Sequence, residues 1–287
     1  MRREDYRLML PRRVSMGWNA LTRRRARDIL AFVRQRGETH PREVLARFSH
    51  GTTTNYWGRS SNAATHLLNE LHYRGQLRVV RRDAGIRIYE PEDALPLVRD
   101  TTTRRARIDA LVNIMVRVYA PLPSATLAWL IGRLRYATPQ WAKEIAPALK
   151  RAKQRFPRAH VDGTDWFWSN DESPTSRRHA VADRVYLLSP FDPVVWDRRR
   201  FERFWGWPYR FEAYTPAHKR RLGYYALPLL WRDSVIGWAN AAWNHGRIDC
   251  QFGYVNGRPR DREFERELEA EISRLQTFLS PSPKREA

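Results

Sequence analysis

Apolar residues recur at helical spacing in three successive stretches near the start of the chain. In the first stretch Ile29, Leu30 and Val33 share one stripe, and Gly37 follows as a stop signal. We predict helices over Thr22–Arg36, Pro41–Phe48 and Gly58–Arg74, then strands over Gln76–Arg82 and Ile86–Glu90 around a turn at 83–85. Three helices followed by a two-stranded ribbon is the element order of a winged helix-turn-helix, which we assign to residues 21–98.

The same order of elements returns farther along the chain. Helical periodicity predicts helices over Arg104–Tyr119, Ser124–Leu134 and Thr138–Arg155. A hairpin over 160–168 follows, and its turn is placed at Asp162-Gly163, a dipeptide that favours two-residue hairpin loops. No close sequence repeat connects the two regions, so the element order alone predicts a second winged helix over 99–170.

The pattern changes at the polar stretch Ser169–Arg178, which we interpret as a linker. Beyond it, short runs of aromatic and β-branched residues alternate with turn residues, which predicts an antiparallel β-domain, a sheet or a small barrel, over 171–287. The predicted strands are Val185–Leu188, Arg210–Tyr214, Tyr224–Leu230, Val235–Trp243 and Ile248–Val255, and a charged helix is predicted over Asp261–Leu279. The predicted fold class is therefore α+β.

The third predicted helix has two well separated faces. Leu67, Leu68 and Leu71 fall on its apolar side at 100° per residue. The residues on the opposite, polar side are Arg59, Asn62, His66 and Asn69. Such side chains reach base edges or phosphates in a DNA groove, although most amphipathic helices have a polar face that only meets solvent. We favour DNA contact, and expect Ala at positions 59 and 62 to weaken duplex binding without loss of thermal stability.

Basic residues greatly outnumber acidic ones. The chain has 52 Lys and Arg against 31 Asp and Glu, a net charge of +21, and residues 1–170 hold 32 of the basic and 15 of the acidic residues. A packed domain does not need this surplus, and the surplus attracts polyanions, so we expect duplex DNA as the partner. The single cysteine, Cys250, excludes a disulfide framework and a cysteine-rich zinc site, and we expect no cofactor.

The N-terminus has no apolar signal segment, and no uncharged stretch is long enough to span a bilayer. These features indicate a soluble, cytoplasmic protein without a membrane partner.

Three further groups of charged residues are candidates for chemistry. The run Lys219, Arg220 and Arg221 has the composition of a phosphate clamp on a loop, or of a solvated turn. The cluster between Lys143 and Arg155 leaves the same two interpretations open. Asp192 and Asp197 could form a general acid–base pair, but we favour a structural role for them as caps of turns.

Two long stretches are unusual enough to indicate a family. They are LLSPFDPVVWDRRR at 187–200 and YRFEAYTPAHKRRLGYYALP at 209–228. With them the chain closely resembles the YcaQ-like winged-helix DNA glycosylases, which unhook interstrand crosslinks. The resemblance implies tandem winged helices and a β-barrel clasped around alkylated or crosslinked duplex DNA, in the bacterial cytoplasm and at the nucleoid. It also implies N-glycosidic hydrolysis, which needs a positioned water and a polar group beside the sugar.

Two parts of that family's pattern do not occur in this sequence. The family activates water with Gln-x-Gln or Gln-x-Asp, and none of the chain's glutamines has Gln or Asp two residues later. Met1 aligns part-way into the family's chain, so we expect residues 1–20 to be the remnant of a preceding winged helix and no catalytic residue to be identifiable. The family's Asp-x-Lys and basic hairpin tip correspond to the nearly uncharged run Asn240–Gly246.

Two functional hypotheses therefore stay open. In the first, the chain is a duplex-binding member of the glycosylase family whose catalytic region is either lost or encoded upstream of a misassigned start codon, so that these 287 residues do not excise bases. In the second, it is a non-enzymatic winged-helix regulator or architectural protein. RNA binding is less favoured, because we expect the aromatic residues in the core, with no exposed stacking platform.

Overall fold

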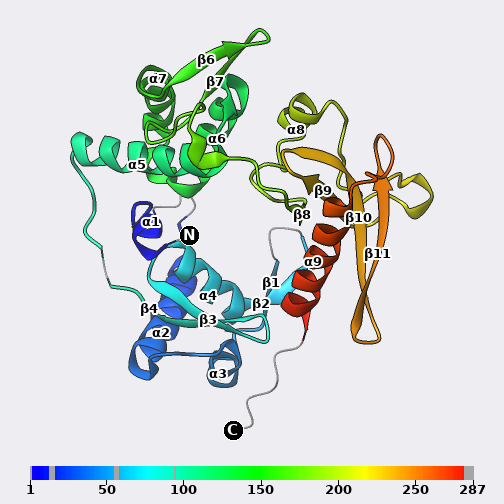
Figure 1. Ribbon diagram of the computed structural model, residues 1–287. Coiled ribbons are helices and arrows are strands. Elements are labelled where there is room, and N and C mark those ends of the chain that lie inside the picture. The colour runs from blue at the N-terminus through cyan, green and yellow to red at the C-terminus, as the bar shows by residue number, and fades with distance from the viewer. Residues whose placement is uncertain (1, 13–16, 55–57, 94, 281–287) are drawn as a thin grey trace. The chain divides into compact units, whose positions relative to one another are not determined.

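The chain divides into two compact units, residues 1–169 and residues 170–287 (Figure 1). The computed structural model describes residues 2–12, 17–54, 58–93 and 95–280.

The first half of unit 1 contains helices and two small antiparallel sheets. Its elements are α1 (Arg3–Arg7), α2 (Ala20–Arg36), α3 (Pro41–Arg47), β1 (Thr52–Thr54), β2 (Ser60–Asn62), α4 (Ala63–Tyr73), β3 (Leu77–Asp83) and β4 (Ile86–Pro91). The predicted stripe of α2 is confirmed, since Ile29 and Val33 are fully buried, and they pack against Leu68 and Leu71 of α4. The helix ends at Gly37, whose positive φ of 80° suits a residue without a side chain.

The third helix begins later than the sequence predicts. Residues 60–62, expected in that helix, form β2, which pairs with β1 in the register Thr52↔Asn62 and Thr54↔Ser60. Asn62 is the N-cap of α4. The hydroxyl and amide residues before Ala63 compete for backbone hydrogen bonds, which disfavours helix there. The polar loop predicted over Ser49–Tyr56 contains β1, and its last two residues lie outside the described ranges.

The second half of unit 1 repeats the order of helices followed by a hairpin. Its elements are α5 (Thr101–Tyr119), β5 (Leu122–Pro123), α6 (Ser124–Ala137), a 3₁₀ segment (Pro139–Glu144), α7 (Ile145–Arg155), β6 (Arg158–Val161) and β7 (Thr164–Phe167). The predicted turn is confirmed, because Asp162 and Gly163 both have positive φ, 48° and 70°. β7 lies between β5 and β6 in a three-stranded sheet.

The helix predicted over Thr138–Arg155 is interrupted near its start. Trp141 has non-helical angles, φ −121° and ψ 25°, and the regular helix α7 begins only at Ile145. Pro147 supplies a physical reason. In a continuous helix its missing N–H would break a hydrogen bond, but in the first turn of α7 that N–H has no intrahelical acceptor.

A short segment after α1 joins the two halves of unit 1. Leu10 is buried, and its carbonyl accepts a hydrogen bond from Arg107 of α5 at 2.7 Å. The carbonyl of Met9 accepts one from Gln140 at 3.0 Å. A Cβ at Gly75 would lie 2.6 Å from the end of the Leu10 side chain and would displace it, and the φ of 78° at this position also favours glycine.

Unit 2 is built on an open antiparallel sheet of four strands. Its elements are a 3₁₀ turn (Arg177–His179), β8 (Val185–Leu187), α8 (Arg198–Trp205), a second 3₁₀ turn (Ala217–Lys219), β9 (Leu227–Trp231), β10 (Ser234–Asn244), β11 (Arg247–Tyr254) and α9 (Arg262–Leu279). The strand order is β11–β10–β9–β8, so this sheet has two edges and does not close into a barrel. The predicted C-terminal helix is confirmed, with Phe264 and Leu268 buried against the sheet.

The helix α9 protects one edge of this sheet. Glu271 accepts a hydrogen bond from the Leu187 N–H at 2.9 Å, and Arg274 donates one to the Val185 carbonyl at 3.1 Å. Both backbone groups belong to the edge strand β8. Satisfying them with side chains removes a template on which another strand would pair.

The strand predicted over Arg210–Tyr214 is wrong. These residues form no regular strand, and the N–H of Thr215 donates to the Glu212 carbonyl in a tight turn. The alternation of aromatic and polar residues suggested a strand, but the Glu212 side chain points inward and binds backbone N–H groups of a later segment.

His72 makes the stability of unit 1 depend on pH. Burial lowers the pKa of His72, although its hydrogen bond with the Leu77 carbonyl at 3.0 Å acts in the opposite direction. The unfolded chain therefore binds the proton more readily. The stabilising effect of neutral His72 is complete above about pH 6.5 and declines as the pH falls from there toward the folded-state pKa.

We expect the melting temperature of the native chain to fall more steeply below about pH 6.5 than that of the His72→Gln variant. Per pH unit, the free energy of unfolding of the native chain should fall by at most about 1.4 kcal/mol more than that of the variant, which is the limit for one proton. Thermal melts at a series of pH values measure it. Equal slopes for the two proteins would contradict the assignment to His72.

Candidate nucleic-acid interface

The four polar residues assigned to one helix face have different structural roles. Arg59 lies one residue before β2 and is exposed, and Asn62 is the cap of α4 rather than part of its face. Only His66 and Asn69 lie on α4 itself. His66 is half-buried and makes no hydrogen bond or ion pair within the described residues.

Asn62 is a structural residue. Its side-chain oxygen accepts hydrogen bonds from the N–H groups of Ala64 at 2.9 Å and Thr65 at 3.2 Å. These N–H groups at a helix start have no partner within the helix, so the side chain supplies one. This geometry gives Asn62 a structural role besides the predicted DNA contact.

We expect Asn62→Ala to lower the free energy of unfolding by about 1 kcal/mol, the usual effect of removing an N-cap. Urea denaturation measures the change. Asn62→Ser keeps a capping oxygen and serves as the control, with most of the stability retained. A loss of equal size in both variants would show that the cap is not the cause.

Asn69 ties α4 to the β3–β4 hairpin. Its side-chain oxygen accepts hydrogen bonds from Arg87 and from the Tyr89 hydroxyl, both at 2.9 Å, and its amide donates to the Thr65 carbonyl at 3.1 Å. The Asn69 side chain, which the helical wheel assigns to the polar face, thus has partners on a neighbouring element, and its role in DNA contact stays a prediction. Asn69 places the guanidinium of Arg87 next to the polar side of α4.

Arg82 and Arg87 form a like-charged pair on the hairpin. They are direct cross-strand neighbours in the β3–β4 register, and both are exposed. Arg82 donates to the Gly85 carbonyl at 2.8 Å, and neither residue has an acidic partner among the described residues. Like charges directly opposite each other destabilise a sheet, so this pair has a cost that a bound anion would offset.

Other arginines of the hairpin are neutralised. Arg78 forms an ion pair with Glu90, its cross-strand neighbour, and Arg81 pairs with Glu38 at 3.1 Å. Arg82 and Arg87 thus differ from the rest of the hairpin in having positive charge that no described carboxylate balances. Sequence reasoning missed them because nothing in the runs QLRVVRR and IRIYE distinguishes paired from unpaired arginines.

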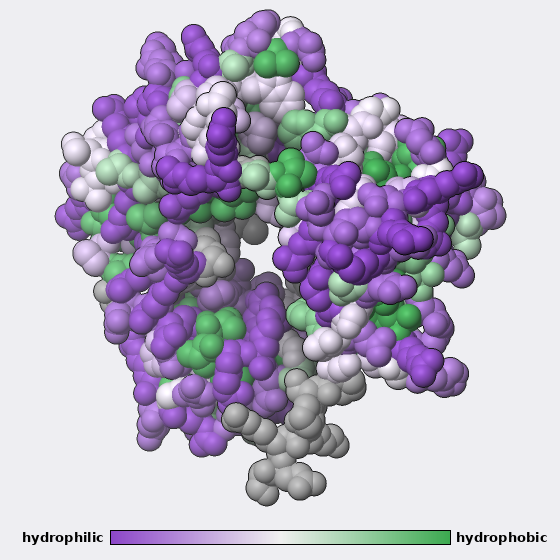
Figure 2. All heavy atoms as spheres, in the orientation of Figure 1, coloured by the Kyte–Doolittle hydropathy of each residue, from purple (hydrophilic) through white to green (hydrophobic). Residues whose placement is uncertain are grey.

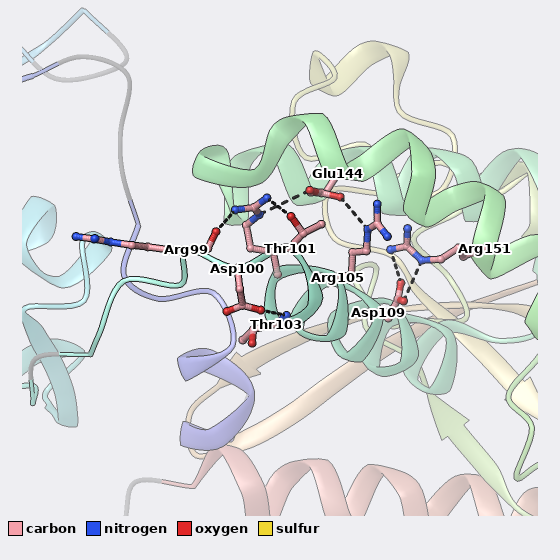
Figure 3. A network of polar contacts seen from close by, with 9 residues as sticks. Arg99, Asp100, Thr101, Thr103, Arg105, Asp109, Glu144 and Arg151 are labelled. Carbon is pink, nitrogen blue, oxygen red and sulfur yellow. Dashed lines mark hydrogen bonds and ion pairs between the residues drawn. The ribbon is translucent and has the colours of Figure 1, made fainter.

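The basic cluster of α7 is largely structural. Arg151 binds Asp109 of α5 through two hydrogen bonds of 3.0 Å (Figure 3). Arg155 donates to the Asp109 carbonyl at 3.0 Å. This bidentate geometry fixes α7 against α5. Lys150 remains exposed, with no ion pair in the described part of the chain. Of the two interpretations of this cluster, the arrangement favours the structural one for its two arginines.

A second set of ion pairs holds the start of α5. Glu144 lies 3.7 Å from Arg104 and 3.8 Å from Arg105, and Arg104 also donates to the Thr101 hydroxyl at 2.9 Å (Figure 3). A cavity of about 590 Å³ is bordered by Arg99, Arg104 and Glu144 among others. Because the Arg104 guanidinium is already paired, this cavity is a weaker anion site than the hairpin.

The three basic residues at 219–221 in unit 2 have different surroundings. Lys219 and Arg221 are exposed, whereas Arg220 donates to the Thr215 carbonyl at 2.8 Å and stacks on the Tyr224 ring at 4.9 Å. The loop therefore presents two cations to solvent and uses the third to hold its own shape. The face drawn in Figure 2 is mostly hydrophilic, with apolar residues in small patches.

The comparison with known protein families agrees with these features. The model of the family described as DNA glycosylase AlkZ-like matches residues 1–278. The chain belongs to the AlkZ-like DNA glycosylase family. Membership relates the chain to DNA binding and DNA repair. Nothing among the solved structures matches the chain.

In this AlkZ-like chain Asp192 and Asp197 act as caps. Asp192 accepts a hydrogen bond from the Val194 N–H at 2.9 Å, and Asp197 is the N-cap of α8, accepting from the Arg200 N–H at 3.2 Å. Both side chains thus have the structural role that the sequence favours.

The AlkZ-like chain has no metal cluster in its described ranges, meaning no group of three or more His, Cys, Asp or Glu side chains in ligating positions. Among the described residues, no helix is long and apolar enough to cross a membrane.

Proposed function

We propose that this chain binds double-stranded DNA and that α4 and the β3–β4 hairpin form its principal contact in unit 1. The observation that carries the proposal is the Arg82–Arg87 pair, two exposed guanidinium groups opposite each other without an acidic partner among the described residues. Asn69 fixes Arg87 beside α4, so helix and hairpin present one surface. DNA phosphates are the anions that such a surface attracts.

The element order supports tandem winged helices. We propose that residues 21–98 and 99–170 are two such modules, that residues 1–20 continue a preceding one, and that residues 171–287 are a β-domain. In this arrangement α4 corresponds to the recognition helix and β3–β4 to the wing. Lys219 and Arg221 of unit 2 supply further phosphate contacts.

The proposed substrate is alkylated or crosslinked duplex DNA. Family membership supports a lesion in DNA, and the resemblance to crosslink-unhooking glycosylases narrows it to bulky N-alkylated purines. The chemistry of excision needs a group that holds water against the sugar. The 287 residues contain no Gln-x-Gln or Gln-x-Asp, which is the group that the resemblance assigns to this task.

Duplex titration tests the binding. We expect the full chain to bind a labelled matched duplex with a dissociation constant of roughly 10⁻⁴–10⁻⁶ M or lower, the range of non-specific binding by basic proteins. Fluorescence anisotropy measures it. Absence of binding at low salt, with the protein folded, would contradict the proposal.

We expect no abasic sites when the 287-residue chain is incubated with N7-alkylated duplex, because loss of a general base alone lowers the rate by about 10²–10⁴-fold. Alkali cleavage of the product strand reveals any excision. Repeated turnover that Asp192→Asn abolishes would instead place an active site in unit 2.

The second candidate is a non-enzymatic regulator or architectural protein. The missing glutamine motif favours it. A regulator prefers a defined sequence of undamaged DNA, whereas a repair protein prefers the lesion. Competition between alkylated and undamaged duplexes of the same sequence separates the two.

A further inference from the structure

We propose that the loop over residues 211–225 of unit 2 binds an unpaired nucleotide of DNA, with the Tyr214 ring stacked on the base and Lys219 and Arg221 near the flanking phosphates. The proposal rests on the proposed DNA binding and extends it from the backbone of a duplex to an unstacked base.

The loop exposes aromatic rings in a way that the sequence did not suggest. Tyr214 is 93% exposed, Tyr224 60% and Tyr225 41%. We expected the aromatic residues of this region in the core, and this expectation is wrong for the loop. A nearly bare ring buries little apolar surface on folding. A ring held out in this way is typical of a surface that stacks on a partner's flat face.

Hydrogen bonds hold the loop that carries Tyr214 in one conformation. Glu212 is only 6% exposed, and one of its oxygens accepts hydrogen bonds from the N–H groups of Arg221 and Leu222, both at 2.8 Å. Asn240 of β10 donates to the Leu222 carbonyl at 2.7 Å. A buried carboxylate shared by successive N–H groups fixes both ends of the loop, so little conformational entropy is lost when its tip binds.

Other aromatic residues of unit 2 pack against the Tyr214 side chain and its neighbours. Phe211 makes edge contacts with Tyr225 and Phe191, both at 5.2 Å between ring centroids, and with Tyr214 at 6.2 Å. The Tyr214 ring therefore touches the rest of the loop through an edge contact and leaves its other surfaces open. The side chain is oriented without being covered.

The loop that carries the exposed Tyr214 ring also carries three consecutive cationic residues, Lys219, Arg220 and Arg221. Arg220 donates to the carbonyl of Thr215, the residue after Tyr214, and its guanidinium lies over the Tyr224 ring. Lys219 and Arg221 are exposed on either side of it in the chain. Aromatic rings interleaved with cations fit a nucleic acid, since the ring stacks on a base while the cations neutralise phosphates.

The charge and the geometry of the loop together indicate an unpaired nucleotide as its ligand. In a fully paired duplex the base faces are stacked on one another, so a single projecting ring has no base to stack on. A nucleotide that is extruded, bulged or left unpaired by a lesion offers such a face. An acidic protein would satisfy the cations but would leave the rigid, bare tyrosine without a specific role.

The experiment compares two labelled DNAs with the full chain by fluorescence anisotropy. One is a matched duplex, and the other is the same duplex with one extra, unpaired purine. We expect tighter binding to the bulged DNA. Tyr214→Ala should weaken that binding by about 5- to 150-fold, the range for loss of one base–aromatic stack. It should change binding to the matched duplex less than about threefold.

Two variants serve as controls. Tyr214→Phe keeps the ring and should retain the preference for the bulge, whereas a role for the hydroxyl would remove it. Phe278→Ala removes another exposed ring, 81% exposed in α9 of the same unit, and should leave both affinities unchanged. Unchanged melting temperatures establish that each variant folds.

The outcomes separate this inference from the duplex-binding proposal. Equal affinity for the two DNAs, or an equal effect of Tyr214→Ala on both, overturns the stacking role and leaves duplex binding standing. Binding to the bulged DNA alone, with its loss in Tyr214→Ala, supports the stacking role and overturns matched-duplex binding. Absence of binding to either DNA overturns both.

Discussion

Affinity for matched duplex DNA is expected to fall by roughly a thousandfold between 50 and 200 mM salt. Each phosphate that the protein neutralises contributes about −0.9 to the slope of log K against log salt, and a site with about six phosphates loses that much affinity. Unit 1 supplies the charge, with 32 basic and 15 acidic residues in positions 1–170. Anisotropy titrations at a series of salt concentrations give the slope.

The Arg82→Ala, Arg87→Ala double variant should reduce the magnitude of that slope by about 1.8, which is 0.9 for each lost phosphate contact. Its melting temperature should stay close to that of the native chain, because relief of the cross-strand repulsion offsets the loss of the hydrogen bonds that Arg82 and Arg87 donate. Weaker binding caused by unfolding would instead lower the melting temperature.

A charge-matched control exists in unit 2. The Arg258→Ala, Arg266→Ala double variant removes the same two charges, and there each arginine has a glutamate partner, Glu265 and Glu263. We expect its salt slope to equal that of the native chain. An equal change in both double variants would mean that net charge, not the hairpin surface, governs binding.

Arg12→Ala is expected to cost unit 1 about 2–4 kcal/mol of its free energy of unfolding, several times the usual effect of a surface change. Arg12 donates to the Ala137 carbonyl at 2.8 Å and to the Tyr73 carbonyl at 3.1 Å, so one guanidinium joins the two halves of unit 1. It also lies over the Tyr73 and Tyr6 rings, at 4.5 and 5.3 Å. Burial lowers the pKa of Arg12, which reflects how far this charge is removed from water.

The loss follows from the number of partners that one side chain serves. Alanine leaves two carbonyl oxygens without their donor and two ring faces without their cation. Arg12→Lys keeps the charge but not the planar fork, so it should restore only part of the stability. Urea denaturation followed by circular dichroism measures each variant.

Arg7 provides the matched control for this prediction. It is a half-buried arginine of α1, and its side chain makes no hydrogen bond or ion pair within the described residues. Arg7→Ala should change the stability by less than about 0.5 kcal/mol. If the two alanine variants lose equal stability, Arg12 does not join the halves.

Much of the fold is readable from local sequence. The helices over residues 20–36, 41–47, 101–119 and 262–279 lie within a few positions of their predictions, because apolar periodicity and stop residues such as Gly37 act over one or two turns. The Asp162-Gly163 turn follows from the positive φ angles that only a few residues accept. Family membership was likewise predictable, since two long unusual stretches carry it.

The candidate interface was decided by tertiary structure. A helical wheel assigns Arg59, Asn62 and Asn69 to one polar face, but it does not show which residues start the helix or which of them bind another element. Asn62 became a cap, and Asn69 became the partner of Arg87 and Tyr89, residues 18 and 20 positions away. Such contacts depend on where separate elements meet, which local periodicity does not specify.

The same limit applies to charge and exposure. The sequence by itself determined that the chain is strongly basic, that its first 170 residues hold most of the surplus, and that its helices are amphipathic. Only the strand register decided that Arg82 faces Arg87 while Arg78 faces Glu90. Only the tertiary structure decided that Glu212 is buried while Tyr214, two residues later, is exposed. Net charge is a sum over residues, whereas an ion pair or an exposed ring is a property of distances between residues far apart in the chain.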